Sequence, residues 1–170
     1  MNIARKNLVS LAIVVAFALF ALCARPAFAS TSDAADVKAT IAKWIADLNK
    51  GDMRSIVAAC ASHTAIVDGF PPFAWQTCAD WMNDYEANNK TIQGTPGILE
   101  IGQSIHEELH GKDAYFIYPS TFSDTQNGKP IVYKGTMTMT LRKTRHGWVF
   151  TGAASAWGVN TLDLSKGVGP

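Results

Sequence analysis

The chain has 170 residues, of which 48% are apolar and 17% are charged. This length suits one domain with a hydrophobic core and is hardly enough for two. The net charge of +1 excludes a strongly basic nucleic-acid binder and an acidic tail, so no nucleic acid is expected among the partners. Three cysteines are too few for a scaffold held together by disulfides.

Residues 1–29 have the pattern of a secretory signal peptide. Arg5 and Lys6 form a basic start, an apolar stretch covers 8–22, and Ala27-Phe28-Ala29 has the pattern of a cleavage site. The alternative is an uncleaved N-terminal anchor, but the apolar stretch is short compared with the roughly 20 residues that span a bilayer. Cleavage after Ala29 predicts a periplasmic or secreted bacterial protein with no membrane contact once the peptide is removed.

Export changes how the two remaining cysteines, Cys60 and Cys78, are interpreted. In an oxidising compartment they can form a disulfide, and closing a loop of about 20 residues stabilises a protein by roughly 3 kcal/mol in the chain-entropy model. The alternative is a pair of buried thiols that pack as small apolar side chains. The sequence leaves both possibilities open.

The first part of the exported chain has the spacing of helices. Apolar residues three and four positions apart predict an amphipathic helix over 33–50. Gly51 fits the left-handed residue that ends a helix, and Asp52 can then cap a second, short helix over 53–60. A third helix is expected over 75–88, where apolar residues again recur with helical spacing.

Strand patterns fill the rest of the chain. A short strand over 65–67 precedes an apolar loop over 70–73, where two prolines exclude regular structure. Alternating and β-rich segments then predict strands over 99–110, 114–122, 133–141 and 148–157. Gly135 within one of them indicates a bend. Helices on one side of an antiparallel sheet make an α+β domain, here over 30–158, with a tail over 159–170.

One segment matches a metal-binding motif letter for letter. His106-Glu107-Glu108-Leu109-His110 has the H-E-x-x-H order of zinc hydrolases, in which a helix brings both histidines to one ion. The extended motif requires Gly and His further on, but Asp113 and Phe116 stand there. The segment also alternates as a strand, on which the two histidines would be about 13 Å apart. We therefore expect no metal site here.

Four short motifs, in this order and spacing, carry a family resemblance. They are Trp44–Asp52 (WIADLNKGD), Ala65–Gly69 (AIVDG), Gly147–Phe150 (GWVF) and Ser155–Trp157 (SAW). The sequence resembles the nuclear transport factor 2-like superfamily, within its SnoaL-like branch, over about 36–158. The resemblance implies a cystatin-like cone with three N-terminal helices packed on a strongly curved antiparallel sheet. It also implies an internal pocket, a homodimer and no cofactor.

The resemblance makes Asp68 a candidate catalytic residue. In the isomerase-type members a general-base aspartate ends the first strand, and Asp68 matches that place. Those enzymes also need an oxyanion donor, from a tyrosine on the first helix and a protonated acid in the sheet. Here the first helix has Trp44 and no tyrosine, and no acid lies within 133–141 or 148–157. The alternative for Asp68 is ordinary turn chemistry before Gly69.

A hollow cone implies that some aromatic residues line a pocket, although most belong to the core. The candidate ligand-binding residues are Trp75, Tyr85, Tyr118, Tyr133 and Trp157, with the loop over 70–75 as a lid. The leading hypothesis is an exported binding or accessory protein for a small apolar ligand. The alternatives are a cofactor-free isomerase, dehydratase or cyclase that uses Asp68, and a homodimeric protein-interaction module.

Overall fold

The computed structural model of the protein describes residues 31–94 and 97–158. The expected signal peptide and C-terminal tail lie outside these residues. Three helices occupy the first part of the described chain: α2 (Thr31–Lys50), α3 (Met53–Ala58) and α4 (Cys78–Thr91). Within the described residues, no helix is both long and apolar enough to cross a membrane.

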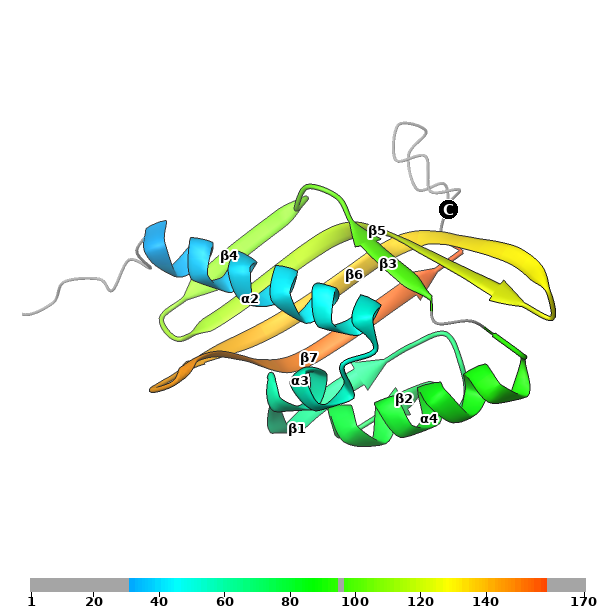
Figure 1. Ribbon diagram of the computed structural model, residues 1–170. Coiled ribbons are helices and arrows are strands. Elements are labelled where there is room, and N and C mark those ends of the chain that lie inside the picture. The colour runs from blue at the N-terminus through cyan, green and yellow to red at the C-terminus, as the bar shows by residue number, and fades with distance from the viewer. Residues whose placement is uncertain (1–30, 95–96, 159–170) are drawn as a thin grey trace, which may run out of the picture.

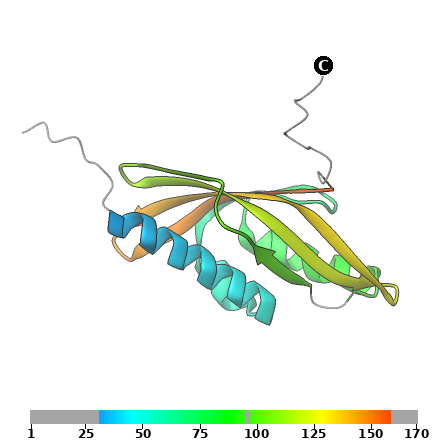
Figure 2. The ribbon, with the colours of Figure 1, turned by 90° about the horizontal axis from the view of Figure 1, so that it is seen from above.

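Within the described residues, seven strands form one sheet. They are β1 (Cys60–Val67), β2 (Ala74–Trp75), β3 (Ile98–Ile101), β4 (His106–His110), β5 (Asp113–Gln126), β6 (Lys129–Thr144) and β7 (Gly147–Trp157). Their order is β2-β1-β7-β6-β5-β3, and β4 also pairs with β5. The helices lie together on one face of the sheet, which curves around them (Figures 1 and 2). The predicted α+β architecture is confirmed.

The sheet is mixed, so the expectation of an entirely antiparallel sheet is wrong. Strand β1 runs parallel to β7, and every other pair is antiparallel. Tight turns force the β5–β6 and β6–β7 hairpins to be antiparallel. No such turn links β1 to β7, because they are far apart in the sequence. Their relative direction is therefore a result of tertiary packing.

Helix α2 lies across part of the sheet and is held to it near both ends (Figure 1). Near its start, Asp33 pairs with Lys143 of β6, and the Lys38 ammonium lies 2.6 Å from the Glu107 carboxylate of β4. Near its end, the Asn49 amide exchanges two 2.8 Å hydrogen bonds with the backbone of Leu99 in β3. The predicted apolar stripe faces the sheet, and its members Val37, Ile41, Trp44 and Ile45 are buried.

Several element boundaries differ from the sequence predictions. The second helix stops at Ala58, and β1 begins at Cys60, which the sequence had placed on a helix. The third helix begins at Cys78 rather than at Trp75, because the Thr77 hydroxyl caps it by accepting a 3.1 Å hydrogen bond from the Asp80 N–H. The predicted strand over 99–110 is divided into β3 and β4.

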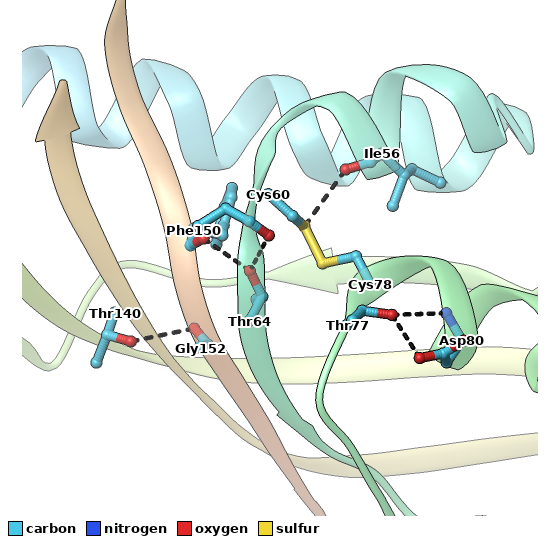
Figure 3. Close-up of a disulfide and its surroundings, with 10 residues drawn as sticks. Ile56, Cys60, Thr64, Thr77, Cys78, Asp80, Thr140, Phe150 and Gly152 are labelled. Atoms are coloured by element: carbon cyan, nitrogen blue, oxygen red, sulfur yellow. Dashed lines mark hydrogen bonds between the residues drawn. A yellow bond between two sulfur atoms is a disulfide. The ribbon is translucent and has the colours of Figure 1, made fainter. Parts of the chain in front are cut away.

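A disulfide joins Cys60 at the start of β1 to Cys78 at the start of α4 (Figure 3). Close by, the fully buried Thr64 hydroxyl donates to the Phe150 carbonyl at 3.0 Å, which fixes β1 against β7. The disulfide therefore links helix α4 directly to strand β1 of the sheet.

The H-E-x-x-H segment forms strand β4, as its alternation predicts. Its histidines, His106 and His110, pair along β5 with Ile117 and Asp113. The Glu107 carboxylate, which would activate water in a zinc hydrolase, pairs with Lys38 instead. In the described ranges, no three histidine, cysteine or acidic side chains are grouped closely enough to hold a metal ion.

Candidate functional site

A cavity of about 540 Å³ lies between the helices and one end of the sheet. Its lining comes from α2, α4, the loop after β1, β3, the end of β5, the start of β6 and the end of β7. The lining residues are Trp44, Leu48, Asp68, Gly69, Phe70, Pro71, Trp81, Tyr85, Asn88, Asn89, Ile92, Leu99, Phe122, Asp124, Gln126, Tyr133, Met137, Ser155, Trp157 and Gly158. We call this part of the molecule the hollow end.

The long hairpin β5–β6 supplies one wall of the cavity. Side chains alternate between the two faces of a strand, so Phe122, Asp124 and Gln126 of β5 all face the helices. In β6, Tyr133 lies opposite Phe122 and Met137 follows on the same face. The wall therefore results from the strand period and the pairing register.

Aromatic rings form two opposing groups around the cavity. On the helix side, Trp81 and Tyr85 are one turn apart on α4, and Trp81 stacks on Trp44 of α2 with ring centroids 5.9 Å apart. On the sheet side, Phe122 and Trp157 have centroids 5.9 Å apart. These rings give the cavity a mostly apolar, π-rich surface.

Asp68 connects the two groups of rings. Its Oδ1 accepts hydrogen bonds from the Trp157 indole at 2.9 Å, from the Gly69 N–H at 2.7 Å and from the Ser155 hydroxyl. Its Oδ2 accepts from the Trp81 indole at 3.1 Å. The carboxylate thus makes the local turn contact expected of Asp-Gly and also lies in the cavity wall.

A second carboxylate, Asp124, lines the same cavity and was missed by the sequence analysis. It is 8% exposed and accepts a 2.6 Å hydrogen bond from the Thr125 N–H. The Gln126 amide lies 3.4 Å from both an Asp124 carboxylate oxygen and the Tyr133 hydroxyl. The predicted strand stopped at Phe122. Extending its alternation to the Asn127 turn would have placed Asp124 on the inner face.

Tyr85 lies close enough to Asp68 and Asp124 for their negative charges to affect the pKa of its phenol. Burial raises the pKa of the Tyr85 phenol, and the negative charges of Asp124 and Asp68 act in the same direction. Hydrogen bonds with the Asn89 side chain and the Gly97 backbone act in the opposite direction on this pKa. The phenol therefore stays protonated well into the alkaline range and can donate a hydrogen bond inside the cavity.

Two of the five predicted ligand-binding residues do not line the cavity. Tyr85, Tyr133 and Trp157 do, but Trp75 and Tyr118 belong to the packed core. The Trp75 indole donates a 2.8 Å hydrogen bond to the Asp84 carboxylate, and the Tyr118 side chain is buried next to Phe116. Residue type and strand period identify the inner face, but they do not indicate which part of that face is left uncovered.

The loop predicted as a lid contributes only in part. Phe70 and Pro71 line the cavity, and the Phe70 ring packs against Trp75 with centroids 4.8 Å apart. Phe73 is 55% exposed and is not among the lining residues. The loop therefore closes one side of the cavity through Phe70.

Comparisons with known proteins agree on the fold. No protein-family model matches the sequence, and no curated protein matches it. Among solved structures, a ketosteroid isomerase-like protein from Erwinia carotovora atroseptica matches with a TM-score of 0.60 and 14% identity, covering 75% of this chain and 98% of that one. A provisionally assigned dehydratase of the NTF2-like family from Streptomyces avermitilis matches with a TM-score of 0.62 and 13% identity, covering 75% and 99%.

A third similar structure is an NTF2-like protein with a cystatin-like fold from Novosphingobium aromaticivorans. It matches with a TM-score of 0.61 and 14% identity, over 77% of this chain and 85% of that one. The structural similarity establishes the fold. At sequence identities this low it leaves the activity open. The chain has the NTF2-like, cystatin-like fold that the sequence motifs predicted.

Proposed function

We propose that the protein binds a small, largely apolar molecule in the cavity at the hollow end. The observation that carries this proposal is the aromatic lining on both walls of a space of about 540 Å³. Ligand sites in proteins are usually concave, mostly apolar and about 300–1,000 Å³ in volume, with a few polar groups that orient the ligand. The signal-peptide pattern of residues 1–29 supports a location for this binding in the periplasm or outside the cell.

The contacts of Asp68 support a cavity that exists before the ligand arrives. Trp81 and Trp157 stand on opposite walls, and both indoles donate to this one carboxylate. The Cys60–Cys78 disulfide holds the start of α4, which carries Trp81, against β1. Binding to rigid walls avoids the entropy cost of ordering them, which favours affinity.

A dye titration tests the proposal. An uncharged apolar dye whose fluorescence rises in apolar surroundings should bind with one saturable site. Tyr133→Ala should weaken that binding by about tenfold, because it removes part of the ring wall. The matched control is Val132→Ala, one residue away on β6 and 58% exposed. Equal effects of the two variants, or no saturable binding, would contradict the proposal and favour the protein-interaction module.

A second candidate function is acid–base catalysis without a cofactor, as an isomerase, dehydratase or cyclase. The observation that favours it is a pair of carboxylates, Asp68 and Asp124, in the same cavity as the protonated phenol of Tyr85. In this function Asp68 removes a proton next to a carbonyl, and a neighbouring donor stabilises the enolate oxygen.

Proton exchange distinguishes catalysis from binding alone. The measurement is the exchange of α-protons of an apolar cyclic ketone for deuterium, followed by NMR in heavy water. Catalysis predicts exchange above the buffer rate that falls by at least about a hundredfold in Asp68→Asn. If the ketone binds but exchanges only at the buffer rate, the protein is a binding protein for this class of compound.

A further inference from the structure

We propose that the preferred ligand is an organic cation, with a tertiary or quaternary ammonium group on an apolar body. This inference rests on the proposed binding function and specifies its ligand. It comes from the charges, the rings and the saturated hydrogen bonding of one carboxylate in the cavity wall.

The charged groups that line the cavity are all acidic. In the described ranges, Asp68 and Asp124 are lining residues, and no lysine, arginine or histidine lines the cavity with them. Such a lining attracts a cation, repels an anion and gains no Coulomb energy from a neutral ligand.

The rings favour the same ligand. The face of an aromatic ring carries negative charge density, and tryptophan and tyrosine attract ammonium groups most strongly. Three tryptophans and two tyrosines line the cavity: Trp44, Trp81, Trp157, Tyr85 and Tyr133. They come from both the helices and the sheet, so rings are available to a ligand from both layers.

The hydrogen bonds of Asp68 indicate which kind of cation fits. Four donors already occupy its two oxygens: two indoles, a hydroxyl and a backbone N–H. A primary ammonium group loses three strong hydrogen bonds to water on binding and needs acceptors in return. A tertiary ammonium group has one N–H and a quaternary group has none. Such a group is therefore attracted by the charge of Asp68 without displacing these donors.

Competition against the apolar dye tests this inference with two isosteric probes. Phenyltrimethylammonium and tert-butylbenzene have the same shape and differ only in whether a charged nitrogen or a carbon stands at the branch. We expect the cation to displace the dye at about tenfold lower concentration than the hydrocarbon. Asp124→Asn and Asp68→Asn should each raise the concentration of cation required by about tenfold and leave that of the hydrocarbon within about twofold.

A matched control separates the cavity from general electrostatics. Glu86→Gln removes one negative charge from the exposed face of α4, outside the cavity lining, and should change neither probe. Should Asp68→Asn fail to fold because two indoles lose an acceptor, Asp124→Asn carries the test alone. Equal displacement by both probes, or no displacement by either, would overturn the cation inference. The proposed function would still stand on the saturable binding of the dye.

Discussion

The same two strands build a packed region at one end of the molecule and a hollow one at the other. In the first part of β5, Phe116 faces Met139 of β6, and both are completely buried. In the last part of β5, Phe122 faces Tyr133, and both line the cavity. We call the first region the packed end. Strand period and register continue unchanged between the two ends, so the difference arises from what covers the sheet.

Helix α2 passes over both regions and shows the change of cover along its length. Val37 and Ile41 are fully buried, whereas Trp44 and Leu48 further along the helix line the cavity. Beyond the end of α2, the cover is completed by α4 and by Phe70 in the loop after β1. These elements enclose the hollow end without filling it. A pocket in this fold therefore depends on how far each helix reaches over the sheet.

The close approach of β6 to β7 at Gly135 provides the largest expected effect. A Cβ atom at Gly135 would lie 1.9 Å from the Ala156 carbonyl oxygen in the neighbouring strand β7. Gly135→Val should therefore separate β6 from β7 and lower the free energy of unfolding by more than about 4 kcal/mol, as measured by denaturant titration. Thr136→Val, the next residue along β6, is the control and should stay near wild type. Wild-type stability of Gly135→Val would contradict the close approach of the two strands.

The two phenylalanines of β5 compare the ends directly. Phe116→Ala removes a completely buried side chain and should cost about 3–5 kcal/mol of unfolding free energy. Phe122→Ala removes a ring that already borders a cavity, and it should cost about half as much or less. Phe122→Ala should instead weaken dye binding, which Phe116→Ala should leave unchanged in protein that remains folded. Equal losses of stability would show that the hollow end is as tightly packed as the other.

The disulfide should matter mainly for the hollow end, because it ties α4 to β1. Replacing both Cys60 and Cys78 with alanine should lower the free energy of unfolding by about 3 kcal/mol. Hydrogen exchange should accelerate first in α4, ahead of the first part of β5 and the last part of β6 at the packed end. Uniform acceleration across the molecule would show that the disulfide stabilises the fold as a whole.

The smallest expected effect is the dependence of stability on pH that arises from two tyrosines, Tyr85 at the hollow end and Tyr118 outside the cavity. Burial raises the pKa of Tyr85, and the charges of Asp124 and Asp68 add to it; burial and the charge of Glu107 raise the pKa of Tyr118. Each neutral phenol therefore favours the folded state below the ordinary tyrosine pKa, and this contribution is lost as pH rises through the raised value.

The phenolate absorbance measures this difference between the ends. One component of the absorbance change, which appears above the ordinary tyrosine pKa, should be absent in Tyr85→Phe. A second such component should be absent in Tyr118→Phe. Cavity occupancy by tert-butylbenzene should raise the pKa of Tyr85 further by excluding water, and should leave that of Tyr118 unchanged. A shift of both tyrosines would mean that ligand binding alters the packed end as well.

Sequence reasoning located the inner face of the sheet better than it located the site. The alternation over 133–141 puts Tyr133, Met137 and Met139 on one face of the strand, and this is the inner face in the structure. The same reasoning stopped β5 too early and so missed Asp124. It also chose Tyr118, which shares the inner face with Phe122 but lies where helices fill the space. A pattern that repeats every two residues indicates which face of the sheet a residue is on. It does not indicate whether that part of the face is covered by a helix.

The local chain chemistry determined the helices, the β5–β6 and β6–β7 hairpins, the caps at Asp52 and Thr77, and the strand nature of the H-E-x-x-H segment. Each depends on residues only a few positions apart, which interact whatever the rest of the chain does. Tertiary structure alone decided the parallel pairing of β1 with β7, the joining of Trp81 and Trp157 through Asp68, and the empty space beside Asp124. Those features require residues up to about ninety positions apart to meet, and their meeting depends on how all the covering elements pack together.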